Sequence, residues 1–98
     1  MSRFSLRHTR AARAQLRAIG VDTEDRWEKP QRNLYLAKLF DGFEAIRKSP
    51  KAGRPRDDLD EGMLSRRVEK HIAYYYVEMD CVVIVGVLHE RMDPARHL

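Results

Sequence analysis

The residues with the most chemical potential lie at the end of a long apolar run. His89-Glu90-Arg91 directly follows the stretch from Cys81 to Leu88. A histidine beside an arginine could supply a general acid and a phosphate clamp for RNA cleavage. The same three residues could also be no more than the polar end of a buried strand. Residue types alone leave both interpretations open.

Three consecutive tyrosines, Tyr74-Tyr75-Tyr76, form a second candidate site. Exposed aromatic rings can stack on nucleic-acid bases. In a strand, alternation places Tyr74 and Tyr76 on one face and Tyr75 on the other. Aromatic residues within a central strand are typical of a core, so we interpret these tyrosines as structural.

Metal and cofactor sites find little support in the sequence. There is one cysteine, Cys81, whose neighbours are valines, so it cannot form an internal disulfide and is expected to be a small buried hydrophobe. Four histidines are scattered along the chain: His8, His71, His89 and His97. Four carboxylates cluster in a loop and are expected to be solvated: Asp57, Asp58, Asp60 and Glu61. With no zinc spacing, phosphate loop or dinucleotide fingerprint, we expect neither a metal nor a cofactor.

The positive charge is concentrated near the N-terminus. The formal net charge is +4, and the first 20 residues contain five arginines and no acid. Arg10, Arg13 and Arg17 share one face of a predicted helix. Such a stripe could meet nucleic acid, an anionic surface or an acidic protein, or it could simply be solvated. Composition does not choose among these.

Length and hydropathy predict one domain spanning residues 1–98. The chain is 43% apolar and 35% charged, which suits a single core under a highly charged surface. No apolar run approaches the roughly 20 residues that span a bilayer, and the first residues contain no apolar signal core. We therefore expect a cytoplasmic protein that does not bind membranes.

Periodicity predicts an initial strand followed by a helix. Residues 3–8 alternate like a strand, Thr9 is a suitable N-cap, and residues 10–19 have helical spacing. Gly20 is expected to end this helix. A second helix is expected from Asp22 or Thr23, with a kink or a break at Pro30, a short first piece around Trp27 and a main body over residues 31–47.

The second half of the sequence predicts a loop and three strands. Residues 48–62 are rich in charge, glycine and proline, which is typical of a loop. Strands are expected over residues 63–69, 71–79 and 81–89, with a tight hairpin at Asp80. The predicted core joins the helices to the last strand through Leu16, Ile19, Leu39, Phe43, Ile46, Val83 and Val85. The order β-α-α-β-β-β predicts an α+β fold in which a helical hairpin packs on a curved, mainly antiparallel sheet.

The succession of residues along the chain resembles a known family. The second helix contains Arg26-Trp27, Gln31, Tyr35, Leu39, Phe43 and Ile46, followed by Ser49-Pro50. Further on come Gly53-Arg54, Asp57, Leu59, Gly62, and His71 four residues before Tyr75. The ending is the most specific part, with Val87-Leu88-His89-Glu90-Arg91-Met92-Asp93 and then His97-Leu98. Together these resemble the ParE branch of the RelE/ParE toxin superfamily.

The resemblance implies the toxin of a bacterial type II toxin–antitoxin system. ParE toxins bind and inhibit DNA gyrase, a type II topoisomerase, and are neutralised in hetero-oligomers by ParD-like antitoxins. It implies a non-enzymatic protein that meets DNA only indirectly, through the antitoxin or gyrase. The alternative is a ribosome-dependent endoribonuclease of the RelE branch that uses His89 and Arg91. RelE enzymes often keep a tyrosine near the end of the last strand, and no tyrosine follows Tyr76 here, which argues against cleavage.

The resemblance also gives expected interaction residues. Contacts with the target are expected from the tail, at His89, Arg91, Met92, Asp93 and His97. Contacts with the antitoxin are expected from the arginine stripe, at Arg10, Arg13 and Arg17.

Overall fold

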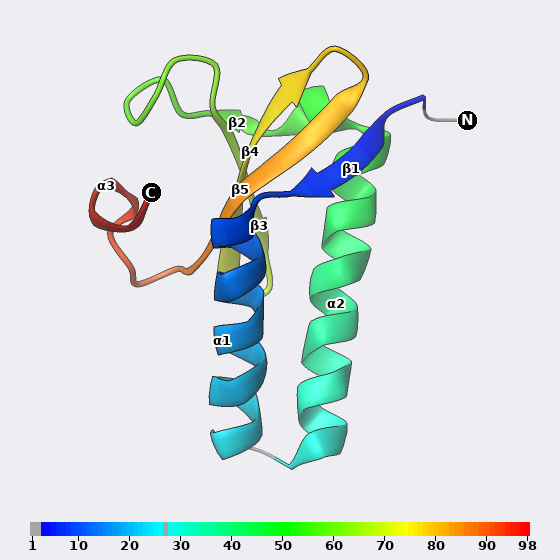
Figure 1. Ribbon diagram of the computed structural model, residues 1–98, viewed down its shortest axis with the longest axis vertical. Coiled ribbons are helices and arrows are strands. Elements are labelled where there is room, and N and C mark those ends of the chain that lie inside the picture. Colours follow the sequence, from blue (N-terminus) through cyan, green and yellow to red (C-terminus); the bar gives the residue numbers. More distant parts are fainter. Residues whose placement is uncertain (1–2, 27) are drawn as a thin grey trace.

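A pair of helices packs on one face of a five-stranded mixed sheet (Figure 1). The computed structural model describes residues 3–26 and 28–98. In chain order the elements are β1 (Ser5–His8), α1 (Arg10–Arg26), α2 (Lys29–Lys48), the 3-10 helix η1 (Pro50–Ala52), β2 (Arg54–Pro55), β3 (Leu64–Val68), β4 (His71–Glu78), β5 (Cys81–His89) and α3 (Pro94–His97). The expected α+β class and the order of the main elements are confirmed.

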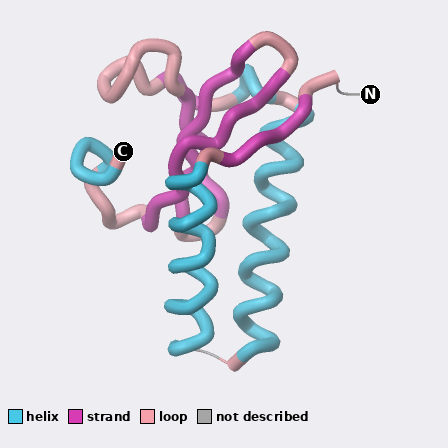
Figure 2. Tube along the Cα trace, in the orientation of Figure 1, coloured by secondary structure: helices cyan, strands magenta, loops and turns pink. Residues whose placement is uncertain are grey.

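The sheet has the strand order β1-β5-β4-β3-β2. β1 runs parallel to β5, and every other neighbouring pair is antiparallel, as expected for a mainly antiparallel sheet. Glu78 pairs with Cys81, so the predicted tight hairpin at Asp80 is confirmed. The predicted loop over residues 48–62 also contains η1 and the short edge strand β2. Figure 2 shows the strands gathered at one end of the two long helices.

Helix α1 is longer than predicted. The Thr9 hydroxyl accepts the Ala12 N–H at 3.2 Å, which confirms Thr9 as the N-cap. Gly20 does not end the helix, because α1 continues to Arg26. An interior glycine costs only about 1 kcal/mol relative to alanine. Packing of the neighbouring Ile19 against the core offsets that cost.

The second helix consequently starts later than predicted. It does not begin near Asp22 or Thr23, which belong to α1, and it is not broken at Pro30. Pro30 lies in the first turn of α2, where its missing N–H has no intrahelical partner to lose. The short helical piece expected around Trp27 falls on a position outside the described residues.

The main core lies between the helices and the sheet. Leu39, Phe43 and Ile46 from α2 are buried there, as predicted, while Leu16 and Ile19 from α1 are partly buried at its border. The sheet residues in this cluster are Ala73, Tyr75, Val82, Ile84 and Val87. The prediction that Val83 and Val85 meet the helices is therefore wrong. The strand phase is shifted by one residue, and a pairing irregularity opposite Tyr74 and Tyr75 shifts it again before Val87.

The opposite face of the sheet carries a smaller cluster. Its buried members are Met63, Tyr74 and Leu88, and Tyr76 and Val85 pack partly against them. Tyr75 instead faces the helices, so the predicted alternation of the three tyrosines is confirmed. Cys81 is only partly buried, at the start of β5, rather than fully buried as predicted. Among the described residues, no helix is both long and apolar enough to cross a membrane.

Candidate functional site

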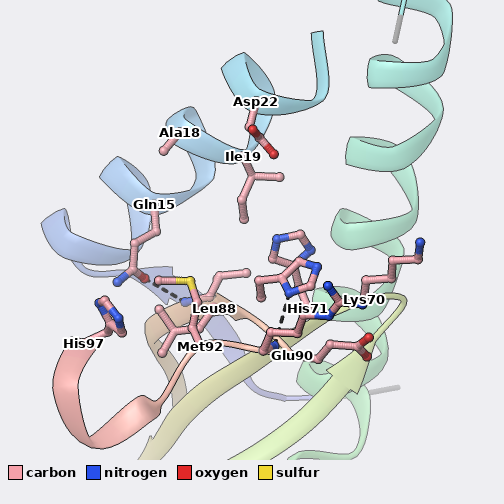
Figure 3. A pocket seen from close by; sticks show the side chains of 13 residues that line it. Gln15, Ala18, Ile19, Asp22, Lys70, His71, Leu88, Glu90, Met92 and His97 are labelled. Atoms are coloured by element: carbon pink, nitrogen blue, oxygen red, sulfur yellow. Dashed lines mark hydrogen bonds between the residues drawn. The ribbon is translucent and has the colours of Figure 1, made fainter. Parts of the chain in front are cut away.

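A pocket of about 670 Å³ lies where α1, the ends of the central strands and the C-terminal tail meet (Figure 3). Helix α1 contributes Gln15, Ala18, Ile19 and Asp22 to its wall. The turn between β3 and β4 contributes Lys70, the start of β4 contributes His71, and the end of β5 contributes residues 87–89. The tail contributes residues 90–92 and His97.

The pocket exists because β1 is shorter than β5. The last residue of β1, His8, pairs with Ile84, so the second half of β5 has no strand beside it on that side. Helix α1 lies there instead, and the Gln15 side-chain oxygen accepts the Val87 N–H at 2.7 Å. A side chain on a helix therefore satisfies a backbone donor that a strand would normally pair.

His71 contacts a tyrosine of α2. The Tyr35 hydroxyl lies 2.5 Å from His71 Nδ1, and the Lys70 N–H donates to the same hydroxyl oxygen at 3.2 Å. The pKa of His71 is lowered to about 4, first by burial and then by the neighbouring His89. The rings of His71 and His89 meet edge to face, with centroids 5.3 Å apart. His71 is therefore a neutral, oriented imidazole at neutral pH.

The start of the tail is fixed to the sheet. The Glu90 N–H donates to the Lys70 carbonyl at 2.8 Å, and the Glu90 carboxylate pairs with Arg67. The Arg91 N–H donates to His89 Nδ1 at 3.1 Å. These contacts hold His89 and the first residues of the tail at the mouth of the pocket.

Four of the five predicted target residues come together in this pocket. His89, Arg91, Met92 and His97 line it. Asp93 does not line it, and instead caps α3 through a hydrogen bond from the Ala95 N–H at 3.0 Å. The grouping follows from the turn after β5, which brings α3 back toward α1.

A glycine in β5 leaves room for the returning tail. A Cβ atom at Gly86 would collide with the Leu98 side chain and would approach the Gln15 amide oxygen at 3.6 Å. Gly86 therefore leaves the space in which the end of the tail packs against the strand. This explains a glycine inside an otherwise continuous apolar run.

The three arginines of the predicted antitoxin surface lie outside the pocket. Arg10, Arg13 and Arg17 are all exposed on α1, as predicted. Gln15 and Ala18 point into the pocket from another face of the same helix. α1 thus presents a basic face to solvent, and a face with smaller and less charged side chains to the pocket.

Sequence reasoning missed several residues of the site. Tyr35 was assigned only to the apolar stripe of α2, yet its hydroxyl positions His71. Gln15 and Lys70 carried no signal, because their roles depend on where β1 ends and how β3 turns into β4. His71 was noted as a strand residue, and only the register that pairs it with His89 joins the two histidines.

Comparison with known proteins identifies the family. The family model described as the ParE toxin of the type II toxin–antitoxin system parDE matches residues 6–94. The chain belongs to the ParE toxin family. It is 34% identical over 89 residues to Toxin ParE1 of Mycobacterium tuberculosis (strain CDC 1551 / Oshkosh), covering 90% of this chain and 91% of the relative. It is 33% identical over 92 residues to Toxin ParE1 of Caulobacter vibrioides (strain ATCC 19089 / CIP 103742 / CB 15), covering 94% and 95%.

A solved structure has the same fold as this ParE toxin. A chain from the chromosomal ParDE TA system from P. aeruginosa superposes with a TM-score of 0.78 at 18% identity, covering 88% of this chain and 95% of that one. At this identity the likeness concerns the fold alone. The expected ParE-like arrangement of a helical pair on a sheet is confirmed.

Proposed function

We propose that this toxin inhibits DNA gyrase by binding it through the pocket and the C-terminal tail. The supporting observation is that the start of the polar C-terminal tail is fixed to the buried strand β5 and to the β3–β4 turn. Leu88 is 1% exposed, and the next residues are tied to the β3–β4 turn and to His89. Met92, by contrast, is 38% exposed. The tail therefore has a fixed start and side chains that a partner can contact.

The same site is poorly suited to RNA cleavage. The pKa of its inner histidine, His71, is about 4, so this ring is neutral at neutral pH and is a weak candidate for a general acid. The nearby Tyr35 hydroxyl is engaged with His71 and Lys70. We therefore favour a non-enzymatic binder acting in the cytoplasm over the endoribonuclease alternative.

A ParD-like antitoxin is the second partner in this proposal. Besides the arginine stripe, the helical pair exposes three large apolar side chains: Val21, Leu34 and Phe40. We propose that an antitoxin segment folds on binding and covers apolar surface beside these helices. Hydrogen exchange with and without antitoxin would measure this directly. Absence of added protection in both α1 and α2 would contradict it.

A supercoiling assay with purified gyrase, toxin and DNA tests the main proposal without ribosomes or RNA. We expect inhibition by the intact chain and weaker inhibition once residues 91–98 are removed. Met92→Ala should also weaken inhibition, whereas Met79→Ala should not. Met79 is a matched control because it is 95% exposed and sits in the β4–β5 turn, at the other end of the hairpin from the pocket.

The opposite result would replace the proposal. If the toxin cut messenger RNA on translating ribosomes and left supercoiling untouched, the endoribonuclease function would be supported instead. His89→Ala would then abolish cleavage, whereas the gyrase proposal expects no cleavage to abolish. Circular dichroism on each variant separates loss of binding from loss of fold.

A further inference from the structure

We propose that the pocket recognises the carboxylate of an acidic side chain on a partner protein, through ring N–H donors of His71 and His89. This inference goes beyond the choice of target, since it concerns the chemical group that the pocket accepts. It rests on the hydrogen bonds that fix both imidazoles, on the charges around them and on the apolar wall beside them.

We assign one tautomer to His71. The Tyr35 oxygen accepts the Lys70 N–H at 3.2 Å, and we assign the Tyr35 hydroxyl as the donor in its 2.5 Å contact with His71 Nδ1. Nδ1 is thus an acceptor, and the single ring proton of neutral His71 is on Nε2. The low pKa of this ring, about 4, agrees with a neutral imidazole.

The second imidazole is fixed in the same way. His89 Nδ1 accepts the Arg91 N–H at 3.1 Å, which places the ring proton of its neutral form on Nε2. Both histidines line the pocket. We place their two Nε2–H groups, on rings whose centroids are 5.3 Å apart, as donors to a ligand in the pocket.

The charges around the rings favour a singly charged acceptor. Lys70 and Arg91 are balanced by Asp22 and Glu90 in the pocket wall, and Glu90 is already paired with Arg67. A phosphate dianion is normally bound by an excess of cations, which this pocket does not offer. A carboxylate carries one charge over two oxygens and matches two N–H donors.

The remaining wall favours a carboxylate on a short apolar stem. Ala18, Ile19, Leu88 and Met92 line the pocket beside the histidines. The volume of about 670 Å³ is larger than a free carboxylate requires. An aspartate or glutamate side chain of a protein would place its methylene groups on this apolar wall and its oxygens at the two rings.

Nitrogen-15 NMR of the histidine rings tests the proposal on the isolated toxin, with sodium acetate as the probe. We expect saturable shifts at the Nε2 atoms of His71 and His89, and none with sodium chloride at equal ionic strength. The ring of His8, whose Nε2 is buried and whose centroid lies 5.1 Å from that of Phe43 in an edge-to-face contact, serves as an internal control and should not respond. The same spectra report the tautomer of each ring.

Two variants sharpen the test. His89→Phe keeps a ring but removes the donor, and should weaken acetate binding about tenfold or more. Tyr35→Phe keeps the α2 stripe but releases His71 Nδ1, so it should weaken binding and show a mixed His71 tautomer. Tyr35 is a positioning residue in this scheme, and the tautomer signal separates that role from a purely structural one.

Three results would overturn the inference. One is the absence of saturable shifts at both rings in a folded protein. Another is tighter binding of inorganic phosphate than of acetate, which would indicate a phosphate site and point to nucleic acid. The third is a ring proton on Nδ1 of either histidine. None of these depends on whether gyrase is inhibited, so this inference and the proposed function can fail separately.

Discussion

Phe43 is the largest side chain that the helices bury completely, at 1% exposure. Its ring meets His8 and Phe40 edge to face, at centroid distances of 5.1 and 5.8 Å. Phe43→Ala should lower the free energy of unfolding by about 3–5 kcal/mol, because a cavity opens in the core. Urea melts measure the change. Phe40→Ala is the matched control, since that ring is 51% exposed and its loss should cost far less. Equal costs for the two variants would show that the helix does not face the sheet as described.

His71 predicts a pH dependence of stability. Its folded pKa of about 4 lies below the value of about 6.5 for an unfolded histidine, mainly because of burial. As pH falls from about 6.5 to about 4, the unfolded chain takes up this proton first, so stability decreases across that window and levels off below it. The loss attributable to His71 should be about 1–3 kcal/mol.

Urea melts across this pH range, on the parent and on His71→Asn, isolate the contribution of one ring. The variant should lose less stability than the parent on acidification. His97→Asn is the control, because that ring is exposed on the tail and should leave the parent's dependence unchanged. Parallel curves for the parent and His71→Asn would mean that His71 is not the group responsible.

At the scale of elements, the two glycines of the helices behave differently. A Cβ at Gly20 of α1 would lie 3.8 Å from the Leu36 side chain of α2, which is an ordinary van der Waals contact. Gly20→Ala should therefore stabilise the protein by about 0.5–1 kcal/mol, as expected for an interior helical glycine. A Cβ at Gly42 would lie 2.5 Å from the Val68 methyl groups, so Gly42→Ala should destabilise by about 1–3 kcal/mol. Thermal melts distinguish the two signs, and destabilisation by Gly20→Ala would restore the idea that α1 ends there.

The sequence predicts elements better than it predicts where they end or which face they bury. Periodicity located both long helices, and apolar runs bounded by turn residues located the strands of the second half. It failed at Gly20, because packing of α1 offsets the small cost of a glycine inside the helix. It failed at Pro30, because the first turn of a helix tolerates proline. It also failed at Val83 and Val85, because a continuous apolar run has no period that reveals its inward face.

The candidate site shows the same limit at the scale of the whole molecule. The tail residues His89, Arg91, Met92 and His97 were identifiable from the ordered succession of the C-terminal sequence. Tyr35 and Gln15 were not identifiable, because their contacts with His71 and Val87 span 36 and 72 residues along the chain. The Gln15 contact is set by the parallel pairing of a short β1 with β5, and the Tyr35 contact is set by the packing of α2 beside the start of β4. No local sequence pattern encodes either arrangement.

The distribution of charge over the molecule carries the last prediction. Five arginines and no acid occupy the first 20 residues of a chain whose net charge is +4. Arg10, Arg13 and Arg17 project from α1 into solvent. Such a surface attracts an acidic partner from a distance and accelerates its association, an effect that salt screens. Reversing one charge, as in Arg17→Glu, should slow association with a ParD-like antitoxin by about threefold to tenfold at low salt and flatten its salt dependence.

Stopped-flow or surface-binding kinetics over a salt series measure this effect. Lys51→Glu is the control, because it changes the net charge equally from an exposed position in η1, away from α1. If steering depends on the arginine face, Arg17→Glu should act mainly on the association rate and Lys51→Glu should change it little. If both variants slow association alike, net charge rather than the α1 face steers the partner. Unchanged association kinetics for both variants would mean that the arginines are simply solvated and do not steer the partner.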